Sequence, residues 1–179
     1  MELAWRKADC RPYTMNPIAE FSIEMLDNVC LKSGWHGPSL VPTLRKLSLD
    51  DLVYAGTYEG YTAWGVALHC AYWKYRVRKR LLQLVPEEPA APRFARGPAD
   101  WPALPQETSE ANWRIDFNLL LAEHAALKDV IVRLPAATFV PPAGRARDGA
   151  SRLIHGIAAH DAYHTAQIRN MGLPNLRRP

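Results

Sequence analysis

The placement of proline is the feature that most constrains how this chain can fold. Fifteen of its 179 residues are proline, and six of these lie in the stretch 86–107. Proline removes a backbone donor and disfavours helix at the residue before it, so proline clusters predict loops. The segments between the clusters carry helical periodicity and no useful strand alternation, at about 17–47, 61–85, 109–134 and 148–171. The sequence therefore predicts an all-α protein.

Residues at the segment ends support helices of these lengths. Pro17 suits a first helical turn, Ser109 and Asp148 are capping residues, and Gly172 is a stop signal. A glycine- and proline-containing run at 34–38 should break the first segment. Four amphipathic helices without strands predict a four-helix bundle, as a single domain over residues 1–179. The long proline-rich linker would let the second and third helices run parallel through a crossover connection.

Composition and charge limit the expected cellular location and binding partners of the protein. A net charge of +4 with a pI near 9.1 is mildly basic, without the clustered excess of a nucleic-acid binder. No apolar run approaches the roughly 20 residues of a membrane-spanning helix, and the amino terminus lacks an apolar secretory region. The three cysteines are an odd number without CxxC spacing. We expect a cytoplasmic protein that binds neither nucleic acid nor membranes.

Five basic residues gather in the second predicted helix. They are Lys74, Arg76, Arg78, Lys79 and Arg80. Such a run is typical of a helix face in solvent, and it is also compatible with an anion-binding site.

Two histidines near the carboxyl terminus carry the strongest chemical signal. His160 and His164 are four residues apart, so a helix places them one turn apart on one face. The same face carries Ile157 and Ile168, so the pair should point into the core. Two inward-facing imidazoles without a partner are costly to bury, and a shared metal ion satisfies both. The alternative is a pair of hydrogen-bonded core histidines.

A third ligand would have to come from another helix. His69 lies in the middle of the second helix, with apolar residues on both sides over 64–73. His124, on the apolar face of the third helix, is the rival candidate. His36 lies beside the expected helix break and is expected to be structural or exposed.

The histidine pattern resembles a known family. The chain is similar to the DinB/YfiT-like superfamily of metalloenzymes through His69 in a tryptophan-flanked helix and through further matches at 35–39, 100–102, Trp113, His155, His160, Tyr163, His164, Gln167 and Ile168. This resemblance spans nearly the whole chain. It implies a four-helix bundle, usually a homodimer, with a divalent metal held by His69, His160 and His164. Some members are thiol-dependent transferases or isomerases that use bacillithiol or mycothiol.

Three neutral histidines with one open position describe a catalytic site of the zinc type, and imidazole ligands also suit nickel. The ion could activate water for hydrolysis, or it could bind the thiolate of a low-molecular-weight thiol that attacks a small electrophilic substrate. The resemblance favours the thiol-dependent S-transferase or isomerase. A metal-stabilised helical interaction module without catalysis is the alternative.

Neighbouring positions supply further candidates. Arg76, Trp73 and Tyr72 lie toward the side of the helix that carries His69 and are candidate substrate-binding residues. Asp161 falls off the face of His160, which predicts an outer or intersubunit role rather than ligation. His155 falls on the opposite face from the histidine pair. We therefore predict that it is not a ligand and that it packs or hydrogen-bonds against a neighbouring helix.

Overall fold

The computed structural model describes residues 16–35, 37–140 and 149–176, and within these ranges the protein is all-helical. The six α-helices are α1 (Pro17–Cys30), α2 (Leu40–Leu44), α3 (Leu49–Val53), α4 (Ala63–Leu82), α5 (Glu110–Arg133) and α6 (Ala150–Asn170), and a 3-10 turn spans Ala136–Thr138. The described ranges contain no strand, and only one isolated bridge joins Gly34 and Gly37. The prediction of an all-α protein is confirmed.

The helix ends follow the capping signals in the sequence. Pro17 occupies the first turn of α1, where the Asn16 side chain accepts a hydrogen bond from the Ile18 amide. The Ser109 hydroxyl caps α5 by accepting from the Asn112 amide, as predicted. Gly172 follows α6 with φ of +79°, a conformation that glycine adopts without strain. Asp148, the predicted cap of the last helix, lies outside the described residues.

The first predicted segment, 17–47, is divided into two helices, and a third short helix follows it. α1 ends at Cys30, and the bridge between Gly34 and Gly37 reverses the chain before α2 begins. The break predicted at 34–38 is therefore present, and His36 within it lies outside the described residues. The short α3 was not predicted. Its start is set by a capping box, in which the Ser48 side chain and the Asp51 carboxylate each bond the other's backbone amide.

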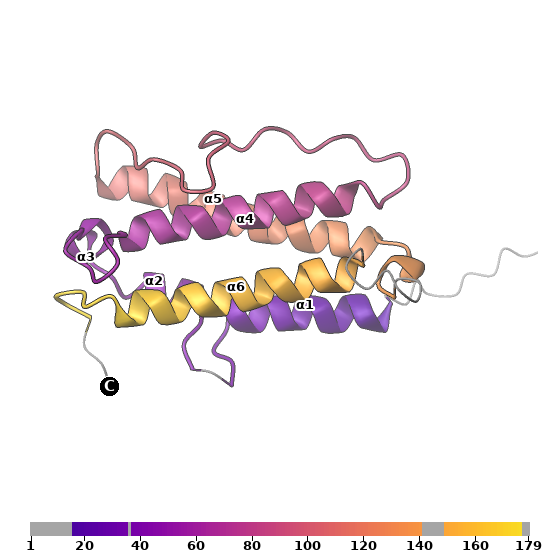
Figure 1. The fold of residues 1–179 in the computed structure, drawn as a ribbon, viewed down its shortest axis with the longest axis horizontal. Helices are drawn as coiled ribbons and strands as arrows, with labels where there is room; N and C mark the ends of the chain where they lie inside the picture. The colour runs from indigo at the N-terminus through magenta and orange to yellow at the C-terminus, as the bar shows by residue number, and fades with distance from the viewer. Residues whose placement is uncertain (1–15, 36, 141–148, 177–179) are drawn as a thin grey trace, which may run out of the picture.

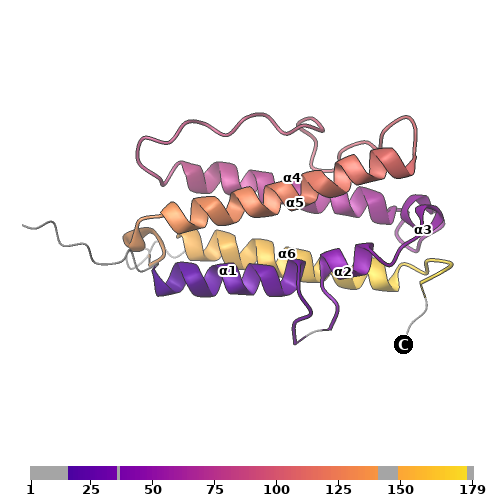
Figure 2. The same ribbon diagram turned by 180° about the vertical axis from the view of Figure 1, so that it is seen from behind.

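The four long helices lie side by side in two layers (Figures 1 and 2). α4 packs on α5 and α1 packs on α6, while α4 also contacts α6 across the layers. The segment 83–109 runs back along α4, so that α4 and α5 run in the same direction (Figure 1). This arrangement places the middle of α4 against the middle of α6.

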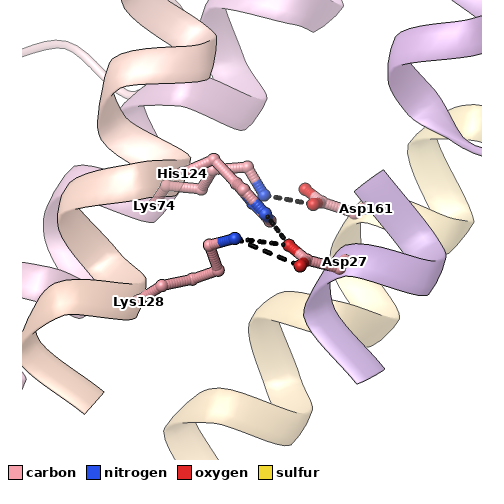
Figure 3. Close-up of polar contacts among 5 residues, drawn as sticks. All are labelled: Asp27, Lys74, His124, Lys128 and Asp161. Atoms are coloured by element: carbon pink, nitrogen blue, oxygen red, sulfur yellow. Dashed lines mark hydrogen bonds and ion pairs between the residues drawn. The ribbon is translucent and has the colours of Figure 1, made fainter. Parts of the chain in front are cut away.

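Two apolar clusters fill the interior, one toward each end of the helices. One cluster includes Trp64, Leu68 and Leu120, and the other includes Leu81 and Leu127. Between them lies a polar layer of one residue from each long helix, buried except for the half-buried Asp27, and Figure 3 draws it together with Lys128. Its members are Asp27, Lys74, His124 and Asp161.

The polar layer is joined by charged contacts between helices. Lys74 donates to Asp161, and the side chains of both are fully buried. His124 Nε2 lies 2.8 Å from Asp27, whose carboxylate also accepts from Lys128. Burial alone would lower the pKa of Lys74, but the adjacent Asp161 carboxylate outweighs it and raises that pKa. Lys74 is therefore a buried cation that ties α4 to α6.

The basic run of α4 divides between the interior and the surface. Lys74 and Arg78 are buried, which corrects the interpretation of the whole run as a helix face in solvent. Arg78 forms a two-pronged contact with Glu123 of α5, at 2.9 and 3.1 Å. Arg76, Lys79 and Arg80 are exposed.

Among the residues that the structure describes, no helix has both the length and the hydropathy to cross a bilayer.

Candidate metal centre

The three predicted histidines meet where α4 crosses the middle of α6. His69 and His164 are buried, and His160 is partly buried one turn before His164 on α6. Their potential ligand atoms all lie within 4.8 Å of one another. The structure thus brings His69, rather than His124, to the pair on α6. His124 instead lies in the polar layer beside Asp27.

The Nε2 atom of His160 lies close to the Nε2 atoms of both other histidines. His160 Nε2 lies 3.2 Å from His69 Nε2 and 3.2 Å from His164 Nε2. Zinc binds imidazole nitrogen at about 2.1 Å, so two ligands of a tetrahedral ion lie about 3.4 Å apart. The observed separations are close to that edge length. This geometry could hold a metal ion with a fourth position left for another ligand.

Hydrogen bonds to the outer nitrogens decide which nitrogens carry lone pairs. His69 Nδ1 donates to the carbonyl oxygen of Asp100, and His164 Nδ1 donates to Gln167 Oε1 at 2.7 Å. The amide orientation of Gln167 is set by its own bond to Glu59, to which Gln167 Nε2 donates. The Nε2 atoms of His69 and His164 are consequently unprotonated and point toward His160.

No proton placement on His160 satisfies all three rings. A proton on His160 Nε2 can be donated to the Nε2 atom of either His69 or His164. The Nε2 lone pair of the other histidine is then left without a donor. A proton on His160 Nδ1 leaves that buried nitrogen without a hydrogen-bond partner in the described residues, and three lone pairs then face each other. A cation at the centre would bind all three Nε2 lone pairs, so that the only nitrogen of these rings without a partner in the described residues would be Nδ1 of His160.

The segment after α4 supports His69 from outside. Trp101 stacks on the His69 ring with centroids 3.9 Å apart, and Tyr61 stacks on Trp101 at 4.1 Å. Two contacts anchor this segment to the helices: Arg96 pairs with Asp116 of α5 at 2.6 Å, and Tyr72 donates to the Pro98 carbonyl at 2.7 Å. The anchored segment holds Asp100 and Trp101 against His69, which fixes its ring.

All three histidines favour the neutral form, because the pKa of each is lowered. Burial, followed by the neighbouring His164 and His69 rings, lowers the pKa of His160 to about 3. Burial is also the main cause that lowers the pKa of His69 and that of His164. Neutral imidazole is the form that binds metal, so no proton has to leave Nε2 when an ion enters at neutral pH.

A pocket of about 530 Å³ opens onto the histidines. Apolar side chains of α4 and α6 form much of its wall, including Trp73, Val77, Leu153 and Ile157. Arg152 lines the same pocket and brings a positive charge to it, and the phenol of Tyr163 also lines it. The volume and the apolar lining are typical of a site for a small organic molecule.

The three predicted substrate-binding residues separate in the structure. Trp73 lines the histidine pocket. Tyr72 and Arg76 line a different cavity, together with Gly97 and Pro98, and there Arg76 donates to the Tyr72 hydroxyl at 2.8 Å. The helical position of Arg76 had suggested a place beside the metal ligands, but the pocket lining puts Arg152 of α6 there instead.

His155 and Asp161 have roles that their helical positions only partly indicated. His155 is exposed on α6, away from the three histidines, so the expectation that it packs against a neighbouring helix is wrong. Asp161 is fully buried in its contact with Lys74, which excludes an intersubunit role for this side chain.

Two further groups in the described residues bring possible ligand atoms together. They are Cys30, His124 and Asp161, and Cys70, His160 and Asp161. Both depend on Asp161, whose carboxylate already contacts the Lys74 cation. Burial raises the pKa of Cys30 to about 12 and that of Cys70 well above its usual value, so both thiols stay protonated. Metal binding requires the thiolate, so these groups fit an ion poorly.

Buried neutral histidines should make the metal-free protein sensitive to mild acid. Burial, aided by the Lys74 charge, lowers the pKa of His124 to about 4, and His160 is shifted the same way. Below about pH 6.5 the unfolded chain takes up protons that these folded-state histidines refuse, so stability falls as pH drops toward about 4. We expect a lower urea midpoint at about pH 5.5 than at about pH 7.5 in the presence of a chelator. Equal midpoints would contradict the assignment of neutral buried histidines.

Sequence reasoning missed several residues that shape the site. Arg152 lies about two helical turns before His160, and only the fold shows that both line one pocket. The bond from Asp100 to His69 uses a backbone carbonyl, which leaves no side-chain signal. Gln167, one of the residues that carry the family resemblance, accepts a hydrogen bond from His164 Nδ1.

Comparisons of the chain with protein-family models, with curated proteins and with solved structures gave no match. The resemblance to the DinB/YfiT-like superfamily therefore rests on the motif residues alone. The molecule itself is an all-helical protein with a buried three-histidine cluster that could hold a metal.

Proposed function

We propose that this protein is a divalent-metal-dependent enzyme whose ion is held by His69, His160 and His164. The proximity of three Nε2 atoms is the observation that carries the proposal, because without a cation at least one of their lone pairs has no partner in the described residues. Three neutral histidines and one open position suit zinc or nickel. The pocket beside them, rather than a closed fourth ligand, favours catalysis over a purely structural ion.

Within that proposal, the reaction is a thiol-dependent S-transfer or isomerisation, as in part of the DinB/YfiT-like superfamily. When bound, the metal would stabilise the thiolate of a low-molecular-weight thiol. The chain's own residues bind and orient: Trp73 offers an aromatic wall for the electrophile, and the Arg152 guanidinium offers a partner for a carboxylate of the thiol. Asp100 and Gln167 hold His69 and His164 in the ligating tautomer.

The family resemblance also implies an architecture. We propose that α1, α4, α5 and α6 form a four-helix bundle of the DinB/YfiT-like type and that the protein is a homodimer. Light scattering at micromolar concentration measures the second point, and a monomeric mass would contradict it.

Metal analysis followed by a thiol screen tests the function. Protein purified without an affinity tag should contain about one Zn²⁺ or Ni²⁺ per chain. The loaded protein should then accelerate the reaction of bacillithiol, mycothiol or glutathione with a chromogenic electrophile, and removal of the metal should abolish the acceleration. Hydrolysis of ester substrates without a thiol would indicate a metal-dependent hydrolase instead. Metal-dependent melting without either activity would indicate a metal-stabilised interaction module.

A further inference from the structure

A second cavity, of about 750 Å³, lies between the carboxyl-terminal half of α4 and the segment 93–98. No residue lines both this cavity and the histidine pocket. Its wall is formed by Tyr72, Tyr75, Arg76, Lys79, Arg80, Gln83, Arg93, Phe94, Gly97 and Pro98. The size lies within the range of pockets that enclose small organic ligands.

The lining of this cavity carries several positive charges and no negative one. Arg76, Lys79, Arg80 and Arg93 line it, and no Asp or Glu is among its lining residues. None of these four cations pairs with a carboxylate in the described residues, whereas the neighbouring Lys74 and Arg78 of the same helix each do. Four like charges around one concave surface repel each other, and a bound anion relieves that repulsion.

Arg76 is held in place by a contact that leaves its charge available. Its Nη1 donates to the Tyr72 hydroxyl at 2.8 Å, and that hydroxyl donates to the Pro98 carbonyl at 2.7 Å. The guanidinium carbon lies 5.7 Å from the centroid of the Tyr72 ring. A guanidinium has five N–H donors, so the remaining donors of Arg76 are free to bind an anion in a fixed orientation.

Aromatic side chains form the inner wall beside these cations. The Phe94 ring lies 5.4 Å from the Tyr75 ring and 5.5 Å from the Tyr72 ring, and all three residues are buried. The cavity therefore joins a firm apolar wall to a cationic rim. That combination suits a ligand with an organic body and a multiply charged phosphate end.

We propose that this cavity binds a phosphorylated small molecule of about nucleotide size, with Arg76 as the oriented phosphate contact and Lys79, Arg80 and Arg93 as the surrounding positive charge. The anion site considered for the basic run of α4 is thereby assigned to its exposed members, joined by Arg93 from the following segment. The proposal is independent of the histidine centre, because the two pockets share no lining residue.

Isothermal titration with ADP, adenosine and citrate tests the proposal. ADP should bind, adenosine should not, and citrate should bind at least about tenfold more weakly than ADP. Raising the salt from about 50 to about 200 mM should weaken ADP binding, since charge drives it. Absence of ADP binding at millimolar concentration overturns the proposal, and so does equal binding of adenosine or citrate.

Paired variants locate the binding. The double variant Arg76→Gln/Arg93→Gln should weaken ADP binding at least about tenfold, because it removes two charged donors. Both side chains are exposed and the loss includes one bond to the Tyr72 hydroxyl, so the melting temperature should change by no more than about 5 °C. The control Arg45→Gln/Arg114→Gln removes the same charge from exposed positions outside the cavity and should leave binding unchanged. Equal affinities of the two double variants would overturn the assignment to this cavity.

Discussion

Replacing His164 with alanine is expected to weaken Zn²⁺ binding by more than about 100-fold, and His69→Ala and His160→Ala should do the same. Loss of an outer hydrogen-bond partner alone costs about 10- to 100-fold in metal affinity, and loss of a ligand should exceed that. Each variant leaves two imidazoles where three now converge. Competition with a chromophoric chelator measures the affinity, and circular dichroism checks that each variant stays helical.

His155→Ala is the matched control for this series. It removes the same side chain from the same helix, at an exposed position away from the cluster, and should keep full metal affinity. Gln167→Leu should have a metal affinity between that of His155→Ala and those of the ligand variants, because His164 would lose the acceptor that fixes its tautomer. If His69→Ala bound metal as tightly as His155→Ala, the site would have to involve another residue, such as His124.

The helices and the histidine pair were predictable because both depend on local spacing. Proline and capping residues act on their own neighbourhood of the chain, so the ends of α1, α5 and α6 follow from signals at Pro17, Ser109 and Gly172. The i, i+4 relation of His160 and His164 is likewise fixed once the segment is helical. These features required no knowledge of how the helices pack.

Contacts between helices were the part that sequence could not supply. A basic run gives no sign of which lysine or arginine will meet a carboxylate from another helix, so the burial of Lys74 and Arg78 went unpredicted. The same holds for Arg76: it lies in α4 as predicted, but it lines a cavity separate from the histidine pocket. The short α3 was missed because five residues are too few to carry a periodic pattern.

Breaking the buried contact between Lys74 and Asp161 is expected to destabilise the protein strongly. Each side chain is fully buried, so removing one partner leaves an uncompensated charge in the interior. Lys74→Met and Asp161→Leu should each lower the free energy of unfolding by about 3–5 kcal/mol. Urea denaturation in the presence of a chelator measures this without any contribution from a bound metal.

The double variant separates the charge effect from packing. Lys74→Met/Asp161→Leu places two apolar side chains together, so its loss should be well below the sum of the single losses. Arg133 and Glu88 form a more exposed ion pair, and Arg133→Met should cost no more than about 1 kcal/mol. Additive losses at Lys74 and Asp161 would contradict a direct interaction between them.

The same pair joins α4 to α6 beside His160, so the single variants should also weaken metal binding. The double variant should restore metal binding if the pair acts by placing the two helices.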